Sequence, residues 1–302
     1  NHFYCFEMGF YTQADYSPLD NLTLIAGGRY DYNKIRVNGG YGGVFNPKLA
    51  VVYSPGRFIV KGIYSEAFQD ASFWTKYGTT QGRLLNNPNL EPEKVKNLEW
   101  NVTWKIKSNA LFNLTAYHAT YHGAVGTVNV TYTDEDGNQI NTTQHQAVGD
   151  YSIQGLQSRF TIKKGNTTAY ANYSFTNPHK ISDEDEKIRV GDIASHRVNA
   201  GVNHIFLQKL NVNLRMNWVG ERVTGENTTV ASNPLEQIDP YFVLHGAVTY
   251  NITQFLTIQI TARNILNREY FHPGVRAANG KNYAAKLPQN KFNLMGKIMV
   301  NL

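Results

Sequence analysis

The sequence predicts an all-β fold, an antiparallel transmembrane β-barrel, and three observations support this prediction. Apolar and polar residues alternate over many stretches of about 10 residues, the length with which a tilted strand crosses a bilayer. Aromatic residues make up 13% of the 302 residues and charged residues only 17%, below the roughly 25% of soluble proteins. The mean hydropathy is -0.42, and no stretch approaches the roughly 18 apolar residues of a membrane helix.

The alternation is clearest in four stretches. Residues 97–106 carry apolar side chains at even positions and polar ones at odd positions, and the same period continues in 211–218, 256–263 and 292–302. The polar positions hold mainly Asn, Thr, Gln and Arg, which suit a water-filled lumen, while the apolar positions suit lipid. Strands of ordinary globular sheets average about 5–6 residues, so a sandwich or propeller fits less well.

The connections between the predicted strands, about 13 in all, alternate in length. Short turns are predicted at 17–20, 54–57, 107–109, 163–166, 207–209 and 251–254. Long connections are predicted at about 34–44, 69–92, 123–149, 178–194, 223–238 and 271–288. In outer-membrane barrels short turns face the periplasm and long loops face the outside. Counted back from the last strand, the first strand runs inward, so we expect an odd number of strands to precede this chain.

The composition of the chain, together with the motifs that it lacks, excludes several classes of function. The single cysteine, Cys5, excludes an intrachain disulfide and a thiolate metal cage. The net charge of +6 comes without a long basic run, so we expect no nucleic-acid partner. No phosphate-binding loop, zinc spacing or Gly-x-Ser-x-Gly motif occurs. We therefore expect no cofactor and no metal.

Several motifs resemble those of TonB-dependent outer-membrane receptors, and they occur in the order of that family. The most specific is Asn-Pro-Asn-Leu-Glu-Pro-Glu at 87–93, which resembles the family's entry from a loop into a strand. The segment 263–270 resembles the penultimate strand of the family. Further similarities lie at 12–15, 24–31, 46–49, 64–68 and 155–157.

The resemblance implies a barrel of about 22 strands around a plug domain, of which residues 1–302 are the C-terminal portion. The implied location is the outer membrane of a Gram-negative bacterium, in contact with its lipid. The implied partners are the plug of the same full-length chain, TonB acting through the missing N-terminal part, and a small nutrient ligand. The implied function is active uptake of a scarce nutrient such as a ferric siderophore, haem or cobalamin.

Two groups of residues are candidates for function. Aromatic, cationic and imidazole side chains in the predicted outer loops can grip an aromatic or anionic ligand, and these are Trp74, Tyr77, Arg83, His145 and His179. Charged residues on the predicted lumen face are expected to pair with one another or with a plug, and these are Arg29, Asp31, Glu99, Arg159, Arg197, Arg215 and Arg263.

Two other functions stay open from the residues alone. A passive porin or channel has the same alternation, but it closes from a single chain, and the odd strand count disfavours it. An outer-membrane hydrolase needs a nucleophile and a base within hydrogen-bond reach, and no such pairing is visible in the sequence. We therefore expect no enzymatic activity and name no catalytic residue.

Overall fold

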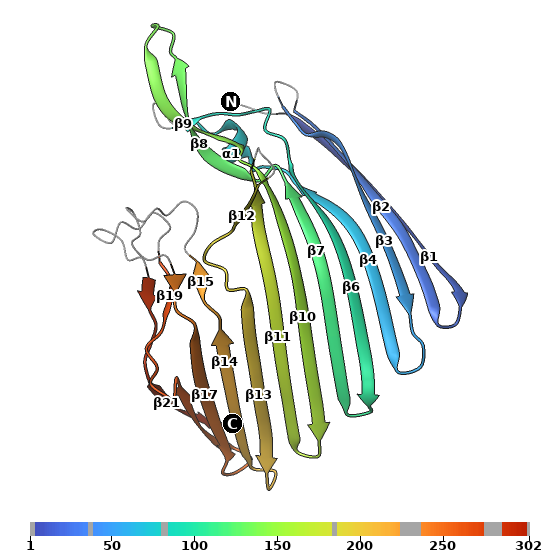
Figure 1. Cartoon of the computed structure of the whole chain (residues 1–302), viewed down its shortest axis with the longest axis vertical. Helices are drawn as coiled ribbons and strands as arrows, with labels where there is room; N and C mark the ends of the chain where they lie inside the picture. The colour runs from blue at the N-terminus through green and yellow to red at the C-terminus, as the bar shows by residue number, and fades with distance from the viewer. Residues whose placement is uncertain are drawn as a thin grey trace.

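The computed structural model describes residues 4–35, 39–79, 84–182, 186–223, 237–274 and 286–300. In these residues one antiparallel sheet of 14 strands dominates the molecule (Figure 1). Thirteen strands follow one another along a single path, and the fourteenth, β12, pairs with β11 beside it. Every pairing on the path is antiparallel, which confirms the predicted fold class and the expected number of strands.

The path runs through long strands joined by tight turns at one end. Its members are β1 (Cys5–Leu19), β2 (Leu22–Ile35), β3 (Gly42–Tyr53), β4 (Phe58–Gln69), β6 (Glu93–Lys107), β7 (Ala110–His122), β10 (Asp150–Lys164), β11 (Thr167–Ile181), β13 (His196–Phe206), β14 (Leu210–Val219), β17 (Tyr241–Asn251), β18 (Leu256–Arg263) and β21 (Asn293–Val300). In Figure 1 the strands are tilted side by side in a curved wall that does not close between β1 and β21.

Shorter elements lie in the long connections at the other end. They are α1 (Phe73–Tyr77), β5 (Leu84–Leu85), β8 (Val125–Thr133), β9 (Gln139–Ala147), β12 (Lys187–Arg189), β15 (Arg222–Val223), β16 (Gln237–Ile238), β19 (Phe271–Pro273) and β20 (Lys286–Pro288). The predicted long connection 123–149 is thus largely a hairpin rather than an irregular loop. No helix in the described part of the chain has the length and apolarity to cross a membrane.

One predicted strand boundary is wrong. The family resemblance predicts a strand over 263–270, whereas β18 ends at Arg263. Asn264 and Asn267 adopt positive φ angles of 48° and 50°, a left-handed conformation that ends a strand and that asparagine tolerates better than most residues. The last long connection therefore begins at residue 264, earlier than the predicted start at 271.

The apolar face of the sheet is unusually exposed. Phe10, Trp100 and Ile298 keep 62%, 51% and 70% of their surface exposed. In a water-soluble protein, burial of each such apolar side chain contributes about 1.5–3 kcal/mol to stability. The exposure of so many of them on one face of the sheet therefore indicates an apolar environment around that face. Within the described residues no second layer covers this face (Figure 1), which agrees with a wall in contact with lipid.

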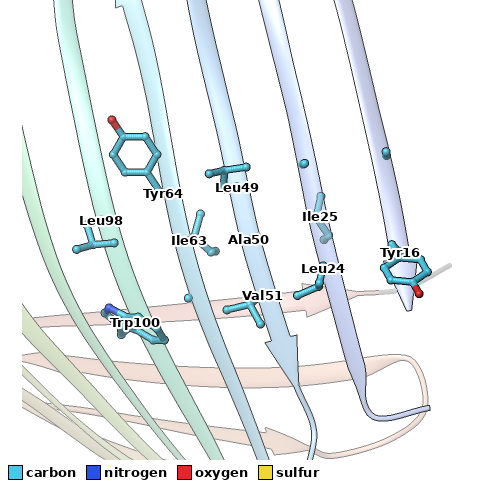
Figure 2. Close-up of a pocket in the computed structure, with 13 residues that line it drawn as sticks. Tyr16, Leu24, Ile25, Leu49, Ala50, Val51, Ile63, Tyr64, Leu98 and Trp100 are labelled. Carbon is cyan, nitrogen blue, oxygen red and sulfur yellow. The ribbon is translucent and has the colours of Figure 1, made fainter. Parts of the chain in front are cut away.

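Part of the apolar face is drawn in Figure 2. Side chains of β1, β2, β3, β4 and β6 surround a shallow depression of about 470 Å³. Tyr16 lies at one side and Trp100 at the other, with Leu24, Leu49 and Val51 between them. Small residues such as Gly62 also line it. The surface of the wall is therefore uneven rather than smooth.

The polar face carries side-chain ladders that bind one strand to the next. Asn101 Nδ2 donates hydrogen bonds to Asn113 Oδ1 at 3.0 Å and to Thr115 Oγ1 at 2.7 Å. Asn113 Nδ2 donates to Thr103 Oγ1 at 2.7 Å. These contacts join β6 to β7 on the face opposite Trp100. The Asn and Thr residues of the alternating pattern thus hydrogen-bond with one another across neighbouring strands.

Strand glycines opposite aromatic residues recur on both faces. In each case the ring of the cross-strand partner lies over the glycine, because the absent side chain leaves a flat site for it. The pairs are Gly62 with Trp100, Gly155 with Tyr117, and Gly201 with Tyr170. These glycines adopt ordinary strand backbone angles and are required for space.

Candidate functional site

The connections at the long-loop end pack together into what we call the rim cluster, residues 39–41, 70–79, 84–92 and 123–149. In Figure 1 helix α1 and the β8–β9 hairpin lie at this end of the wall. Strand β5 pairs in parallel with β9, where Leu84 lies opposite Thr143 and Leu85 opposite Gln144. Two segments that are distant in the sequence therefore belong to one small β-sheet.

Helix α1 presents one side chain outward and holds another inside. Ser72 caps its start, because Ser72 Oγ accepts a hydrogen bond from the Thr75 backbone N–H at 3.1 Å. Gly78 caps the end of the helix, and its N–H donates to the Trp74 carbonyl at 2.8 Å. Trp74 is 64% exposed, while Lys76 is 1% exposed. The single turn of helix thus offers an indole ring to the outside and points a cation into the cluster.

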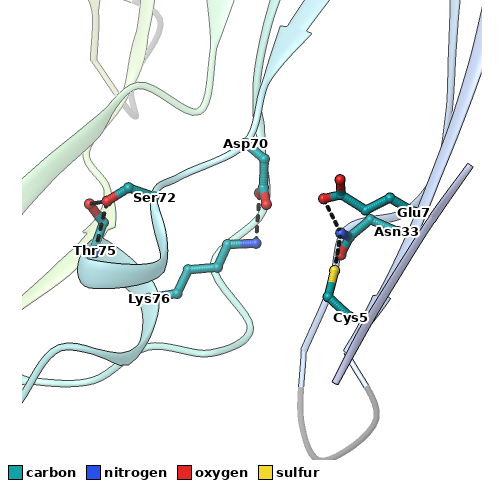
Figure 3. A network of polar contacts seen from close by, with 7 residues as sticks. All are labelled: Cys5, Glu7, Asn33, Asp70, Ser72, Thr75 and Lys76. Carbon is teal, nitrogen blue, oxygen red and sulfur yellow. Dashed lines mark hydrogen bonds and ion pairs between the residues drawn. The ribbon is translucent and has the colours of Figure 1, made fainter. Parts of the chain in front are cut away.

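The buried ammonium of Lys76 is compensated by Asp70. Figure 3 shows Lys76 Nζ directed at the carboxylate of Asp70, and the distance from Nζ to Asp70 Oδ1 is 2.6 Å. The contact is an ion pair rather than a well-aligned hydrogen bond, since neither atom has a hydrogen-bond partner among the residues that the structure describes. A buried pair of this kind fixes the position of α1, because either charge alone is costly to bury.

Asn87 connects the helix to the hairpin. Its backbone N–H donates to the Lys76 carbonyl at 2.8 Å, and its side-chain Nδ2 donates to the His145 carbonyl at 2.8 Å. Beside it, Gln144 Nε2 donates to the Asn86 carbonyl at 2.7 Å. The first residue of the Asn-Pro-Asn-Leu motif is therefore a structural bridge, which the sequence could indicate only as a family pattern.

Replacing Asn87 with alanine is expected to loosen the β8–β9 hairpin from α1. The substitution leaves the His145 carbonyl without its donor, and such a loss costs about 1–3 kcal/mol when the group is buried. Hydrogen exchange of the amides in 139–147 measures the effect and should accelerate about 10-fold or more. Asn89→Ala is the matched control, since Asn89 belongs to the same motif but is exposed. Equal acceleration in both variants contradicts the bridging role.

Tyr77 is a packing residue of the rim cluster. Its ring is 5.6 Å from that of Phe73, and its hydroxyl lies against Gly39, which has a φ angle of 96° and no room for a Cβ atom. Burial, together with the negative charge of Asp70, raises the pKa of the Tyr77 hydroxyl. The group therefore stays protonated and neutral at physiological pH.

The remaining ligand candidates lie in different places. His145 is on β9, where its Nδ1 is 3.3 Å from the Thr127 hydroxyl. His179 is near the end of β11, paired between Ser152 of β10 and Arg189 of β12, on the apolar face of the wall. Arg83 lies outside the described residues. The structure thus brings Trp74, Tyr77 and His145 into one cluster and leaves His179 apart.

The seven charged candidates share the polar face of the sheet. The strand registers place Arg159 opposite Asn113 and Asn172, and Arg215 opposite Gly201 and His245. The others occupy the same phase of their strands: Arg29, Asp31, Glu99, Arg197 and Arg263. Arg29 Nη2 forms an ion pair with Asp31 Oδ1 at 2.7 Å. Contact with a plug domain stays a prediction.

The chain matches a known family over most of its length. A family model described as TonB dependent receptor-like, beta-barrel covers residues 6–265. The chain belongs to this family. The resemblance indicated by the motifs is confirmed, and membership of the family implies the outer membrane of a Gram-negative bacterium as the location of the receptor barrel. The family consists of transport receptors rather than enzymes.

Relatives of the receptor barrel extend the comparison. It is 22% identical over 270 residues to the iron-regulated outer membrane virulence protein of Vibrio cholerae, and the match covers 86% of this chain and 40% of the relative. The siderophore receptor PirA from Acinetobacter baumannii has a TM-score of 0.75 at 14% identity, over 97% of this chain and 45% of that one. The ferric enterobactin receptor of Pseudomonas aeruginosa in complex with enterobactin has a TM-score of 0.78 at 14% identity, with the same coverage.

These solved structures establish the fold of the TonB-dependent receptor barrel. At 14% identity they do not show which residues of this chain contact a ligand. The chain spans less than half the length of the relatives, at 40% and 45%. Sequence reasoning missed Asp70 and Lys76 and indicated Asn87 only as part of a family motif, because the roles of these residues arise from contacts between separate loops.

Proposed function

We propose that this chain is the C-terminal part of the barrel of a receptor that imports a ferric siderophore with energy delivered through TonB. Two kinds of observation support this. The family is that of TonB-dependent receptors, and the relatives include an iron-regulated outer membrane protein and receptors named for siderophores. The chemistry of the rim cluster supports ligand capture at the outer end.

In this proposal the two faces of the wall have separate tasks. The apolar face is held by outer-membrane lipid, and the polar face lines a lumen occupied by a plug domain of the same full-length chain. TonB acts on the N-terminal part of that chain. The ligand first meets the rim cluster, and energy spent on the plug then opens the path along the polar face.

The exposed indole of Trp74 is the single observation that carries ligand capture. Trp74 keeps 64% of its surface exposed. The capped helix and the buried ion pair beside it fix the position of the ring, which can therefore stack on a planar aromatic group. Aromatic rings supply large contact area with little loss of side-chain entropy. Ferric complexes of catechol-bearing siderophores present such planar aromatic groups.

Uptake of iron tests the proposed function directly. The gene that encodes this chain is deleted, and cells are grown under iron limitation with a panel of ferric siderophores, catechol-bearing ones first. Import of radioactive iron should fall at least about 10-fold for one member of the panel and should be lost equally when TonB is absent. Uptake that continues without TonB indicates a passive channel. Unchanged uptake across the panel contradicts a siderophore receptor.

Replacing Trp74 with alanine is expected to weaken binding of that siderophore about 10-fold, which corresponds to about 1.4 kcal/mol. Binding is measured on intact receptor in outer-membrane fragments, by displacement of labelled ferric siderophore. Leu207→Ala serves as the matched control, because Leu207 is a 92% exposed apolar residue at the opposite, turn end of the wall. If Trp74→Ala binds as tightly as Leu207→Ala, ligand capture lies elsewhere on the rim.

A further inference from the structure

The apolar face of the wall changes its chemistry along strand β6. Trp100 and Leu98 belong to this face, and Lys96 and Lys94 occupy the next two positions of the same phase toward the long-loop end. Alternate residues of a strand share one face, so the two lysines lie on the side of the sheet that carries Trp100. On β6 the apolar face therefore ends in two neighbouring cations.

Two apolar depressions lie on either side of the ridge that Leu98 and Trp100 form. The depression drawn in Figure 2, of about 470 Å³, lies toward β4. The other has a volume of about 460 Å³ and lies toward β7 and β10, where Ala116 and Leu156 line it. Leu98 and Trp100 line both. A depression gives an acyl chain more contact than a flat wall, because dispersion attraction grows with the number of atoms in contact.

The charges of the two lysines are not neutralised by neighbouring side chains. Both lysines are exposed, and within the described residues neither Lys94 nor Lys96 has an ion pair or a side-chain hydrogen bond. Glu66 on β4 is the direct cross-strand partner of Lys96, but its carboxylate accepts a hydrogen bond from the Tyr64 hydroxyl. The ammonium groups therefore stay available to an anion outside the wall.

Two imidazoles extend this polar zone from β6 onto β7 and β10. His122 is the direct cross-strand partner of Lys94, and its Nδ1 is 2.8 Å from Asp150 Oδ2. His118 lies on the same face of β7, and its Nε2 is 3.1 Å from the hydroxyl oxygen of Ser152. The carboxylate of Asp150 is thus engaged by His122 rather than by a lysine. Near the long-loop end the outward face therefore carries cations and hydrogen-bonding groups above an apolar area.

We propose that this surface binds a glycolipid of the outer leaflet that carries phosphate groups and several acyl chains. The phosphates lie at Lys94 and Lys96, and the acyl chains occupy the two depressions beside Trp100. Short turns of such barrels face the periplasm, so the lysines lie at the outer end, and each lysine near an anionic lipid surface strengthens binding. The inference rests on the assignment of the apolar face to lipid under the proposed function. A plug domain in the lumen does not cover this face.

The test uses the intact receptor, purified in detergent, freed of lipid and titrated with bisphosphorylated lipid A by native mass spectrometry. Lipid A is expected to bind with a dissociation constant below about 10 μM. The double variant Lys94→Gln, Lys96→Gln should bind it at least about 10-fold more weakly. The matched control is Lys105→Gln, Lys107→Gln, which removes two exposed lysines at the turn end of the same strand and should change binding less than about 2-fold.

Two further lipids and one further variant separate the contributions of the phosphates and the acyl chains. Dephosphorylated lipid A should bind the wild type as weakly as lipid A binds the lysine double variant. Phosphatidylglycerol, with one phosphate and two chains, should bind at least about 10-fold more weakly than lipid A. Ala116→Phe fills the depression on the side of β7 and should weaken binding of lipid A about 3-fold. Heat-modifiable migration on gels checks that each variant is folded.

Absence of lipid A binding to the wild-type receptor overturns the proposal, and so does undiminished binding in a folded lysine double variant. Equal binding of phosphatidylglycerol overturns the choice of an outer-leaflet glycolipid, and an unchanged affinity in Ala116→Phe overturns the placement of the acyl chains. The assay requires neither iron nor TonB. If no siderophore is imported while lipid A still binds through the lysines, the function proposed above fails and this site stands.

Discussion

Replacing Asp70 with asparagine is expected to release helix α1 from the rim cluster and to cost about 3 kcal/mol of local stability. The change leaves the ammonium of Lys76, which is 1% exposed, without a countercharge. We place the effect at the low end of the range for broken buried pairs, because the Asp70 side chain is 26% exposed. The loss should be local, since the cluster lies outside the strands of the wall.

Hydrogen exchange of the amides in 72–79 and 84–92 measures this release. Glu269→Gln is the control, because it breaks the ion pair between Lys291 and Glu269, whose side chains are 60% and 65% exposed, and exposed pairs contribute little. The double variant Asp70→Leu, Lys76→Met should recover much of the protection, since it removes both charges together. Protection in Asp70→Asn equal to that of the wild type contradicts a stabilising role of the pair.

Replacing Gly62 with valine is expected to destabilise the folded barrel by about 1–3 kcal/mol. A Cβ atom at Gly62 would lie 2.7 Å from Cζ3 and 2.9 Å from Cη2 of the Trp100 ring, closer than such atoms approach. The ring, which faces the apolar depression in Figure 2, must then leave its place over the neighbouring strand. Contacts across the β4–β6 pair are lost with it.

Urea titration of the barrel folded into lipid vesicles measures the free energy of unfolding in this series. Gly296→Val is the matched control, because Gly296 is a strand glycine of the apolar face, and a Cβ atom added there would have no other atom of the described residues within 4 Å. That variant should be neutral or slightly stabilised, since valine favours strands. Adding Trp100→Ala to Gly62→Val should recover part of the loss. Equal effects at both glycines rule out the steric explanation.

The strands of this receptor were predictable because their signal is local and repeated. Residues 97–106 show both faces of the wall in the sequence itself, since a strand that meets lipid on one side and water on the other must alternate at every residue. The turn at 54–57 is equally local, because Pro55 and Gly56 restrict the backbone directly. The family motif at 87–93 indicated the barrel of a TonB-dependent receptor for the same reason, since it is contiguous.

Only the tertiary structure decided which contacts the loops make and where the wall is hollowed. The roles of Asp70 and Asn87 depend on Lys76 and His145, which belong to other segments, and no alternation marks such contacts. The two apolar depressions beside Trp100 are lined by residues of neighbouring strands, which meet only because the registers align them. Side-chain chemistry that depends on distance in space, rather than on distance along the chain, leaves no periodic trace in a single sequence.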